Sequence, residues 1–378
     1  MDPQHDFSPA VGRRVAAIAL EAIVRDSLPE SARNGIDPER VLEQFEATRL
    51  DSLDRLSIAG KVNSFFGIHE TGLEDSLLRS GKASDWVDIA WRSLARPEPY
   101  IAFQTSGTTG EPKRVIQPIS VLLQEIEELA RIFASARRVV STVSAKHIYG
   151  FLFTALLPEH LRIPRIDARD VGPSFWRREL AGGDLIVSFP DYIQYFIDSQ
   201  ISLPSGAWTV TSTAPCPPSL WVRAGEAGIQ RMSEVYGSTE TGGIGLRHAG
   251  SDPFELFSHF SRSDDSRTLL RRQPDGSSVP VPLMDDIEWV DERKLRPTGR
   301  RDGSVQIGGV NVSPDAVAGK IMEHPDVLDA RVRFDSGTAR LRARVRISAR
   351  GDEGAIRRWL EDRLSSSELP KALDFARE

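Results

Sequence analysis

The chain has 378 residues, a formal net charge of −6, and 27% charged against 40% apolar residues. This length exceeds what one hydrophobic core normally accommodates, so we expect two or three domains. The negative balance argues against a general nucleic-acid-binding protein, which would carry a strong basic excess. The single cysteine, Cys216, excludes an internal disulfide framework and suits a reducing compartment.

The N-terminal segment "RRVAAIALEAIVRD" has two features of a signal peptide, a basic start and an apolar run. However, Glu21 and Arg25 interrupt the apolar run, and no small-residue cleavage site follows. No stretch approaches the ~18 apolar residues that would span a bilayer. We therefore predict a cytoplasmic protein with neither a membrane nor a nucleic acid as partner.

Residues 1–96 read as helical, because apolar positions recur at helical spacing in 15–24, 53–66 and 86–94. The stretch "ARPEPY", residues 95–100, then marks a boundary. From residue 100 onward, strand patterns at 100–104, 138–144, 184–190 and 208–215 alternate with helix patterns at 121–134 and 219–229. That alternation predicts an α/β domain with ligand-binding loops at the edge of its sheet.

A small α+β unit follows "PTGRRDG", residues 297–303. It begins with a helix at 313–325, which Ser313 would cap and Pro314 would open. Paired strands at 329–334 and 340–348 and a closing helix at 352–364 complete it.

The stretch "TSGTTGEPK" directly follows the first strand of the α/β region. A loop that binds phosphate needs glycines, free N–H groups, hydroxyl donors and a cation. The loop supplies all four, although it does not match the G-x-x-x-x-G-K-[ST] P-loop, and a plain turn is the alternative. The candidate residues are Thr105, Ser106, Gly107, Thr108, Thr109, Gly110 and Lys113.

Three stretches in this order, "TSGTTGEPK", "EVYGSTETGG" and "PTGRRDGSVQIGGVNVSP", resemble the adenylate-forming enzymes. These are acyl- and aryl-CoA ligases, carrier-protein ligases and luciferases. The resemblance covers roughly Pro99 to Lys371. It implies an α/β fold with a reduced adenylation domain at 97–300 and a small C-terminal domain at 301–378.

The resemblance also implies a reaction. Such enzymes join a carboxylate to the α-phosphate of ATP, release pyrophosphate, and pass the acyl group to a thiol. Residues 105–113 would hold the β- and γ-phosphates. Within "YGSTE", Tyr236 would stack on adenine with Gly237 and Ser238 beside it, Thr239 would bond the α-phosphate, and Glu240 would help to hold Mg²⁺.

The ribose-binding residue is harder to assign, because relatives carry it in a T-G-D stretch that this sequence lacks. Asp285 and Asp286 both lie at a suitable separation from Arg300, and we prefer Asp286. Arg300 resembles the arginine that contacts the nucleotide, and Asp302 falls on the hinge about which the small domain rotates. Gly308 and Gly309 match the loop that lines the thiol channel.

"AKHIYGFLFTALLP", residues 145–158, resembles the segment in which many relatives place a histidine beside the acid. His147 would take that catalytic position, although a lone histidine among aromatic residues is often structural. Tyr149, Phe151 and Ala214 would line the acid pocket. The stretch "HIYGF" is similar to ligases for aromatic acids such as hydroxybenzoates, although a medium-chain fatty acid would also suit an apolar pocket.

Residues 49–90 resemble an acyl carrier protein, so we predict a carrier-like domain at 1–96. Such domains attach phosphopantetheine to the serine of a D-S-L tripeptide, and Ser52 occupies that position. A phosphopantetheinyl transferase would supply the group from CoA. Arg49 replaces the usual glycine, and capping of a helix is the alternative role for Ser52.

The end of the sequence, "ELPKALDFARE", departs from the family pattern. Relatives continue to a lysine that reaches the carboxylate and the α-phosphate, whereas Lys371 matches an earlier, non-catalytic position. Loss of such a cation typically costs on the order of 10²–10³ in rate, so we expect impaired adenylation.

The predicted function is ATP-dependent activation of an aromatic acid and its transfer to the pantetheine thiol of a carrier protein. The alternatives are a CoA ligase whose N-terminal helices only dock, and a non-catalytic nucleotide-binding homologue.

Overall fold

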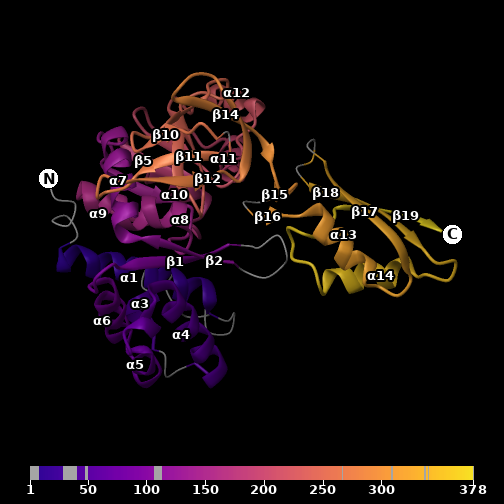
Figure 1. The fold of residues 1–378 in the computed structure, drawn as a ribbon, viewed down its shortest axis with the longest axis horizontal. Helices are drawn as coiled ribbons and strands as arrows, with labels where there is room; N and C mark the ends of the chain where they lie inside the picture. Colours follow the sequence, from indigo (N-terminus) through magenta and orange to yellow (C-terminus); the bar gives the residue numbers. More distant parts are fainter. Residues whose placement is uncertain are drawn as a thin grey trace.

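The computed structural model describes residues 8–28, 41–46, 50–105, 113–265, 267–307, 310–335, 338 and 340–377. The N-terminal helices lie at the bottom of Figure 1, the large α/β part lies above them, and a small sheet-and-helix unit lies to the right. This mixed α/β architecture with a small C-terminal sheet domain confirms the predicted fold class.

The N-terminal helices begin and end at residues suited to those positions. Ser8 accepts a hydrogen bond from the Val11 N–H, and Pro9 opens the first helix. Asp51 caps the next long helix, and Gly67, with a φ of 63°, ends it in the left-handed conformation. The helices are α1 (Pro9–Ser27), α3 (Val41–Gln44), α4 (Ser52–Phe66), η3 (Ile68–Glu70), α5 (Glu74–Arg79) and α6 (Ala83–Leu94).

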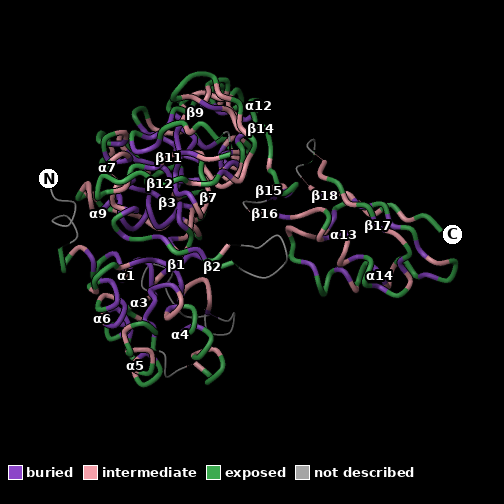
Figure 2. The backbone as a smooth tube through the Cα atoms, in the orientation of Figure 1, coloured by how far each residue is buried: buried purple, intermediate pink, exposed green. Residues whose placement is uncertain are grey.

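These helices share one hydrophobic core with the α/β part. A continuous buried cluster includes residues from Val15 in α1 to Leu295 in the large sheet. At its centre, the rings of Phe65, Phe103 and Phe151 meet edge to face, with centroids 5.5 to 5.9 Å apart. Buried backbone accordingly continues from the helices into the region above them (Figure 2). The predicted boundary at residue 96 thus marks a change of secondary structure within one core.

The large sheet has nine strands. Its order is β13 (Asp285–Trp289), β14 (Lys294–Arg300), β9 (Phe254–Leu256), β8 (Gly242–Arg247), β7 (Met232–Ser238), β6 (Trp208–Thr211), β5 (Asp184–Ser188), β3 (Arg138–Ser141) and β4 (Arg165–Asp167). Strands β4, β3, β5, β6 and β7 are parallel to one another, and the remaining pairs are antiparallel.

The helical connections are α7 (Ile119–Ile132), α8 (Ile148–Gly150), the π-helix η4 (Phe151–Leu156), α9 (Leu157–Leu161), α10 (Pro173–Arg178), α11 (Pro190–Asp198) and α12 (Pro218–Glu226). The chain leaves β3 toward β4 on one side and leaves β5 toward β6 on the other. The carboxyl ends of β3 and β5 therefore form a topological switch point, where α/β sheets bind their ligands.

Smaller sheets surround this one. The hairpin of β1 (Tyr100–Thr105) and β2 (Lys113–Pro118) connects the N-terminal helices to α7. A three-stranded antiparallel sheet comprises β10 (Phe260–Arg262), β11 (Thr268–Arg272) and β12 (Ser278–Pro282).

The C-terminal unit has its own core, which runs from Ile307 to Leu364. The Ser313 hydroxyl accepts from the Ala316 N–H at 3.2 Å and so caps the first helix, as predicted. The elements are β15 (Val305–Ile307), β16 (Val310–Val312), α13 (Pro314–Met322), β17 (Val327–Asp335), β18 (Arg340–Ile347), α14 (Glu353–Glu361) and β19 (Ala372–Arg377). Across the described part of the chain, no helix is long and apolar enough to cross a membrane.

Candidate active site

The β1–β2 hairpin brings both ends of the predicted phosphate loop together. Thr105 and Lys113 are register partners, and the Thr105 hydroxyl donates to the Lys113 carbonyl at 3.4 Å. Five residues of the predicted phosphate loop lie outside the described residues: Ser106, Gly107, Thr108, Thr109 and Gly110. Gly308 and Gly309 of the predicted thiol channel lie outside them too.

The β7–β8 turn carries Thr239 and Glu240, both half-buried. Its ends are joined by reciprocal bonds between Ser238 and Thr241, from backbone N–H to hydroxyl, at 3.0 and 3.2 Å. A Cβ on Gly237 would lie 2.1 Å from the Gly242 carbonyl oxygen, so only glycine fits there. The sequence therefore builds a tight turn that holds these two side chains at the end of β7.

Three buried side chains form hydrogen bonds with the backbone of this turn and of the start of β8. The Gln117 amide on β2 donates to the carbonyls of Thr239 at 2.6 Å and Glu240 at 3.0 Å. Arg271 of β11 donates to the Thr241 carbonyl at 3.1 Å, and the Glu125 carboxylate on α7 accepts from the Gly243 N–H at 2.9 Å. None of these three residues was predicted from the sequence. Gln117 could have been noticed, because it is a polar residue at an inward-facing position of a strand.

Glu125 is almost completely buried. Burial raises the pKa of its carboxyl to about 7, although Arg271 and the Gly243 N–H act in the opposite direction. The group therefore titrates near neutral pH, directly behind the turn.

Tyr236 and Asp285 are in direct contact. The Tyr236 hydroxyl donates to the Asp285 carboxylate at 2.7 Å, and the Tyr236 ring packs on Phe254 with centroids 5.3 Å apart. Arg300 Nε lies 3.8 Å from the Asp285 carboxylate. Burial raises the pKa of Asp285, against the effects of Tyr236 and Arg300. Two residues predicted to contact the nucleotide, Tyr236 and Arg300, thus meet around Asp285.

Asp286, the residue preferred from the sequence, lies on the opposite face of β13. Its carboxylate pairs with Arg301 at 2.9 Å, and its side chain is 67% exposed against 17% for Asp285. Side chains alternate along a strand, so only one of the two aspartates can face Tyr236.

Asp302, the predicted hinge residue, is held by its neighbours. Arg300 Nη2 lies 2.8 Å from its carboxylate, and both the N–H and the hydroxyl of Ser304 donate to it. Burial alone would raise its pKa, but Arg300 and Ser304 lower the pKa of Asp302 to about 2.

The predicted acid-binding residues follow parallel strands at the same sheet edge as Tyr236. His147 lies in the loop after β3, at the switch point, and Ala214 is half-buried in the loop after β6. The surrounding protein, which desolvates the ring, and the charge of Lys146 lower the pKa of His147 to about 4. Its imidazole is therefore neutral at pH 7, although the residue as a whole is exposed to solvent.

Tyr149 and Phe151 have structural contacts. The Tyr149 hydroxyl is hydrogen-bonded to the carbonyls of Ser188 at 3.1 Å and Val210 at 2.9 Å, at the ends of β5 and β6. Phe151 has no exposed surface and belongs to the aromatic cluster with Phe65. Their role in lining an acid pocket stays a prediction.

The loop after β6 is fixed by a buried ion pair. The Glu234 carboxylate accepts from the Cys216 N–H at 2.9 Å and pairs with Arg247 at 2.6 Å. Thr213 in this loop has a φ of 74°, a conformation that is strained for a β-branched residue. Strain of this kind persists only where surrounding contacts enforce it.

Comparison with known proteins identifies the family. The AMP-binding enzyme family matches residues 61–314. The chain belongs to this family. A 4-coumarate–CoA ligase of Halorhodospira halophila is 37% identical over 340 residues, which cover 88% of this chain and 86% of that protein.

Other relatives agree. A 4-coumarate–CoA ligase of Rhodobacter capsulatus is 35% identical over 93% of this chain and 91% of its own length. A 3,4-dihydroxybenzoate–[aryl-carrier protein] ligase of Bacillus anthracis is 23% identical over 79% of this chain and 74% of its own length. The predicted membership of the adenylate-forming enzymes is thus confirmed, and acid activation is the chemistry of the family.

Solved structures share the fold. An amide bond synthetase from Marinactinospora thermotolerans aligns with a TM-score of 0.60 and 20% identity over 73% of this chain. The alignment spans 65% of that protein, slightly less than two thirds. A malonyl-CoA ligase aligns with a TM-score of 0.58 and 18% identity over 73% of this chain and 70% of its own.

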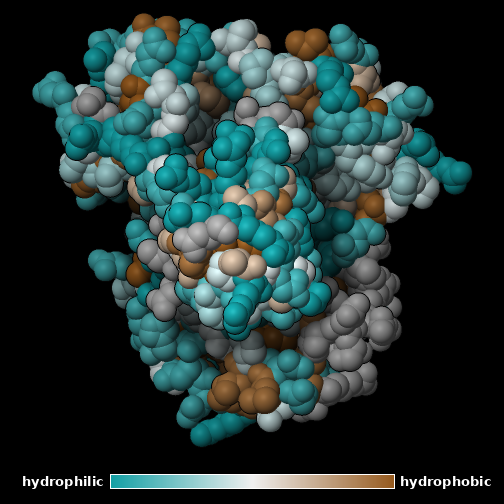
Figure 3. Space-filling model, turned by 90° about the vertical axis from the view of Figure 1, so that its right-hand side faces the viewer, coloured by the Kyte–Doolittle hydropathy of each residue, from teal (hydrophilic) through white to brown (hydrophobic). Residues whose placement is uncertain are grey.

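In this AMP-binding enzyme, Ser52 is the exposed first residue of α4, and the cap is Asp51, which accepts from the N–H groups of Leu53 and Asp54. Leucines of α4 and α5 are exposed nearby: Leu53, Leu56 and Leu78. Figure 3 shows hydrophobic surface at the lower end of the molecule, where these helices lie in Figure 1. Attachment of phosphopantetheine to Ser52 stays a prediction.

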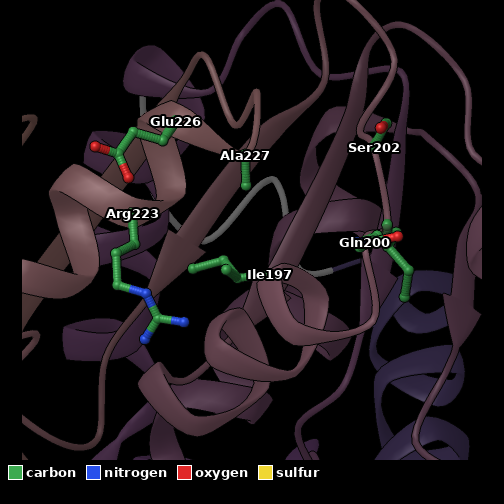
Figure 4. A pocket seen from close by; sticks show the side chains of 7 residues that line it. Ile197, Gln200, Ser202, Arg223, Glu226 and Ala227 are labelled. Atoms are coloured by element: carbon green, nitrogen blue, oxygen red, sulfur yellow. The ribbon is translucent and has the colours of Figure 1, made fainter.

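The AMP-binding enzyme also has a surface hollow of about 340 Å³ between α11 and α12, lined by Ile197, Gln200, Arg223 and Glu226 among others (Figure 4). Its lining residues lie in the last turns of α11 and α12 or just after them, where the chain returns to the amino ends of β6 and β7. The hollow is therefore at the sheet edge opposite the predicted site.

Mg²⁺ is implied by the family. Among the described residues, no three or more His, Cys, Asp or Glu side chains surround a common point. Mg²⁺ that accompanies ATP takes only one or two carboxylates besides phosphate oxygens. Glu240, half-buried and next to Thr239 in the turn, offers a carboxylate of that kind, so the residue fits the ion.

Proposed function

We propose that this enzyme joins an aromatic acid of the 4-coumarate type to CoA, with conversion of ATP to AMP and pyrophosphate. Binding of ATP is supported mainly by the contact of Tyr236, Asp285 and Arg300. These residues lie beside the turn that contains Thr239 and Glu240. The names of the relatives support the choice of acid and thiol.

The nucleotide would lie across the end of β7. Tyr236 would present its ring to adenine, and Asp285 would accept hydrogen bonds from the ribose hydroxyls. Asp285 is favoured over Asp286 because it alone faces Tyr236 and Arg300. Arg300 would contribute positive charge near the phosphates, within electrostatic range of Glu240.

In the first half-reaction, a carboxylate oxygen of the acid attacks the α-phosphorus of ATP, and pyrophosphate leaves. The Thr239 hydroxyl would bond the α-phosphate, and Glu240 would help to hold Mg²⁺, which neutralises phosphate charge. In the second half-reaction, the CoA sulfur attacks the acyl carbon and AMP leaves. The tight turn supports this chemistry because it fixes the backbone that carries both side chains before the substrates arrive.

CoA is favoured as the thiol by the extent of one alignment. The Rhodobacter relative covers 93% of this chain, so its alignment includes the helical segment 49–90 that resembles a carrier. That segment is therefore shared with a protein named as a CoA ligase. The family match also begins at Lys61, inside α4.

The carrier protein remains the second candidate thiol. The Bacillus relative is named as an aryl-carrier protein ligase, and Ser52 is exposed at the start of a helix with apolar neighbours. Incubation with a pantetheinyl transferase and CoA tests this alternative. A mass increase by one phosphopantetheine that is lost in Ser52→Ala would support it.

The main experiment is a ligase assay with MgATP, CoA and a panel of 4-coumarate, 4-hydroxybenzoate and octanoate. We expect a CoA thioester by mass spectrometry, fastest with 4-coumarate, and a loss of at least ~10²-fold in rate for Glu240→Gln. AMP release without any CoA thioester would contradict CoA as acceptor. A preference for octanoate would contradict the aromatic acid.

A further inference from the structure

A half-buried carboxylate, Asp26 at the end of α1, contacts two loops of the α/β part. Asp26 accepts from Arg169 Nη1 at 2.6 Å and from the Ser144 hydroxyl at 2.7 Å, and Lys146 Nζ lies 3.0 Å away. Ser144 and Lys146 follow β3, and Arg169 follows β4. One side chain from the N-terminal helices thus joins the carboxyl ends of two parallel strands.

A second layer of charges surrounds this contact. Arg169 also binds Asp167 at 2.6 Å, and Asp167 pairs with Arg25, the residue before Asp26, at 2.8 Å. The side chains of four of these residues are 10 to 18% exposed: Arg25, Asp26, Asp167 and Arg169. Removal of one partner from a largely buried network leaves the opposite charge uncompensated, so each member depends on the others.

The loop that Asp26 holds leads directly to His147. The Ser144 hydroxyl bonds Asp26, and the Ser144 carbonyl lies so close to Gly150 that a Cβ there would be 2.0 Å away. The Ser144 carbonyl also accepts from the His147 N–H at 3.3 Å. The backbone between Ser144 and Gly150 is therefore fixed from both ends, and His147 lies between them at the switch point of the sheet.

We propose that Asp26 is a positioning residue for acid binding: it holds Ser144 and Lys146, and through them it sets the place of His147. This inference rests on the proposed function and on the sequence-based prediction that His147 lies beside the acid. It makes the last turn of α1 a functional part of the adenylation site. Burial alone would raise the pKa of Asp26, but Arg169, Lys146 and Ser144 outweigh it and lower the pKa, so the carboxylate is ionised at neutral pH.

The chain contains a matched control. Glu21, also on α1, pairs with Arg165 at 2.8 Å, and its side chain is 16% exposed against 18% for Asp26. Arg165 opens β4 and has no bond to the His147 loop among the described contacts. Glu21→Gln therefore removes a comparable ion pair between α1 and the α/β part without touching residues 144–147.

Kinetics of Asp26→Asn and Glu21→Gln test the proposal. We expect Asp26→Asn to raise KM for the acid by roughly tenfold or more, with KM for ATP within about twofold of wild type. Glu21→Gln removes one ion pair and should lower the melting temperature, but leave the acid KM unchanged, and Ser144→Ala should reproduce part of the Asp26→Asn effect. Equal acid KM values for the two α1 variants, or equal losses for acid and ATP, would overturn the proposal.

A second readout does not depend on ligase activity. The imidazole resonances of His147, assigned by their absence in His147→Gln, should shift in Asp26→Asn and stay in place in Glu21→Gln. If the wild type ligates no acid of the panel, the proposed function fails, and the resonances still decide whether Asp26 positions His147. Unshifted resonances in Asp26→Asn would refute the positioning role.

Discussion

Asp285 and Asp286 are neighbours on β13 whose carboxylates face opposite sides of the strand, which makes them a matched pair for testing the nucleotide site. We expect Asp285→Ala to weaken ATP binding by at least ~10-fold, because a bond between a charged group and a hydroxyl contributes about 1.5–3 kcal/mol. Asp286→Ala removes only an exposed pair with Arg301, and calorimetry should show unchanged affinity. Equal losses in both variants would refute the assignment of Asp285.

Glu125 should make the stability of the protein depend on pH. Its folded-state pKa of about 7 lies above the usual 4.5, so the folded protein binds this proton more tightly than the unfolded chain. The contribution of this group to the free energy of unfolding is therefore greatest below pH 4.5. It declines as the pH rises to about 7, by roughly 3 kcal/mol in total.

The isosteric variant Glu125→Gln removes this titration. Relative to the wild type, it should be more stable at pH 8 than at pH 5, because at pH 8 only the wild type must keep an ionised carboxylate buried at this position. Denaturant unfolding at the two pH values measures the difference. A variant that loses the same stability at both pH values would show that Glu125 does not titrate in this range.

The site residues that the sequence could predict are those in contiguous motifs. Tyr236, Thr239 and Glu240 occur in one short stretch, and local chemistry identifies them. Gln117 and Arg271 could not be found in this way, because they come from β2 and β11 and converge only after the strands have paired. The preference for Asp286 depended on spacing alone, without the side-chain alternation that places Asp285 beside Tyr236.

At the scale of elements, Gln117 links the strand after the phosphate loop to the β7–β8 turn. Replacement by leucine would leave the carbonyls of Thr239 and Glu240 without their buried donor and would loosen the turn. We expect Gln117→Leu to lower kcat by roughly 10²-fold, with a smaller change in the KM for the acid. Gln124→Leu is the control, since Gln124 also donates to a backbone carbonyl, that of Arg272, but outside the site. A similar kcat for the two variants would contradict this role.

The elements that the sequence predicted are those with a strong apolar period. The strand patterns at 100–104, 138–144, 184–190 and 208–215 became β1, β3, β5 and β6, and the helix patterns at 121–134 and 219–229 became α7 and α12. The antiparallel half of the sheet was not predicted. Strand β8 reads "GGIGLR" and β9 has three residues, so neither shows alternation, and both are stabilised by their neighbours in the sheet.

At the scale of the whole molecule, the N-terminal helices complete the core of the adenylation part. Phe65 of α4 contacts Phe103 of β1 and Phe151 of η4, so one aromatic cluster spans the predicted boundary at residue 96. The resemblance to a carrier protein predicted a carrier-like domain at 1–96, and that assignment stays a prediction. A sequence pattern shows which residues of a helix are apolar but not which surface they cover.

Because the two parts share this core, a substitution in α4 should destabilise both of them. Phe65→Ala should destabilise the protein by about 3–5 kcal/mol, the usual cost of removing a buried phenylalanine. Because the cluster includes both parts, circular dichroism and tryptophan fluorescence, which comes from Trp86 and Trp91 of α6 as well as from the α/β part, should report one shared transition at a lower denaturant concentration. Leu53→Ala is the control, since this leucine is 77% exposed on the same helix and should leave stability within about 0.5 kcal/mol. An independent carrier domain would give a different result: in Phe65→Ala the helices would unfold first, and both signals would show two transitions, the second at the wild-type midpoint.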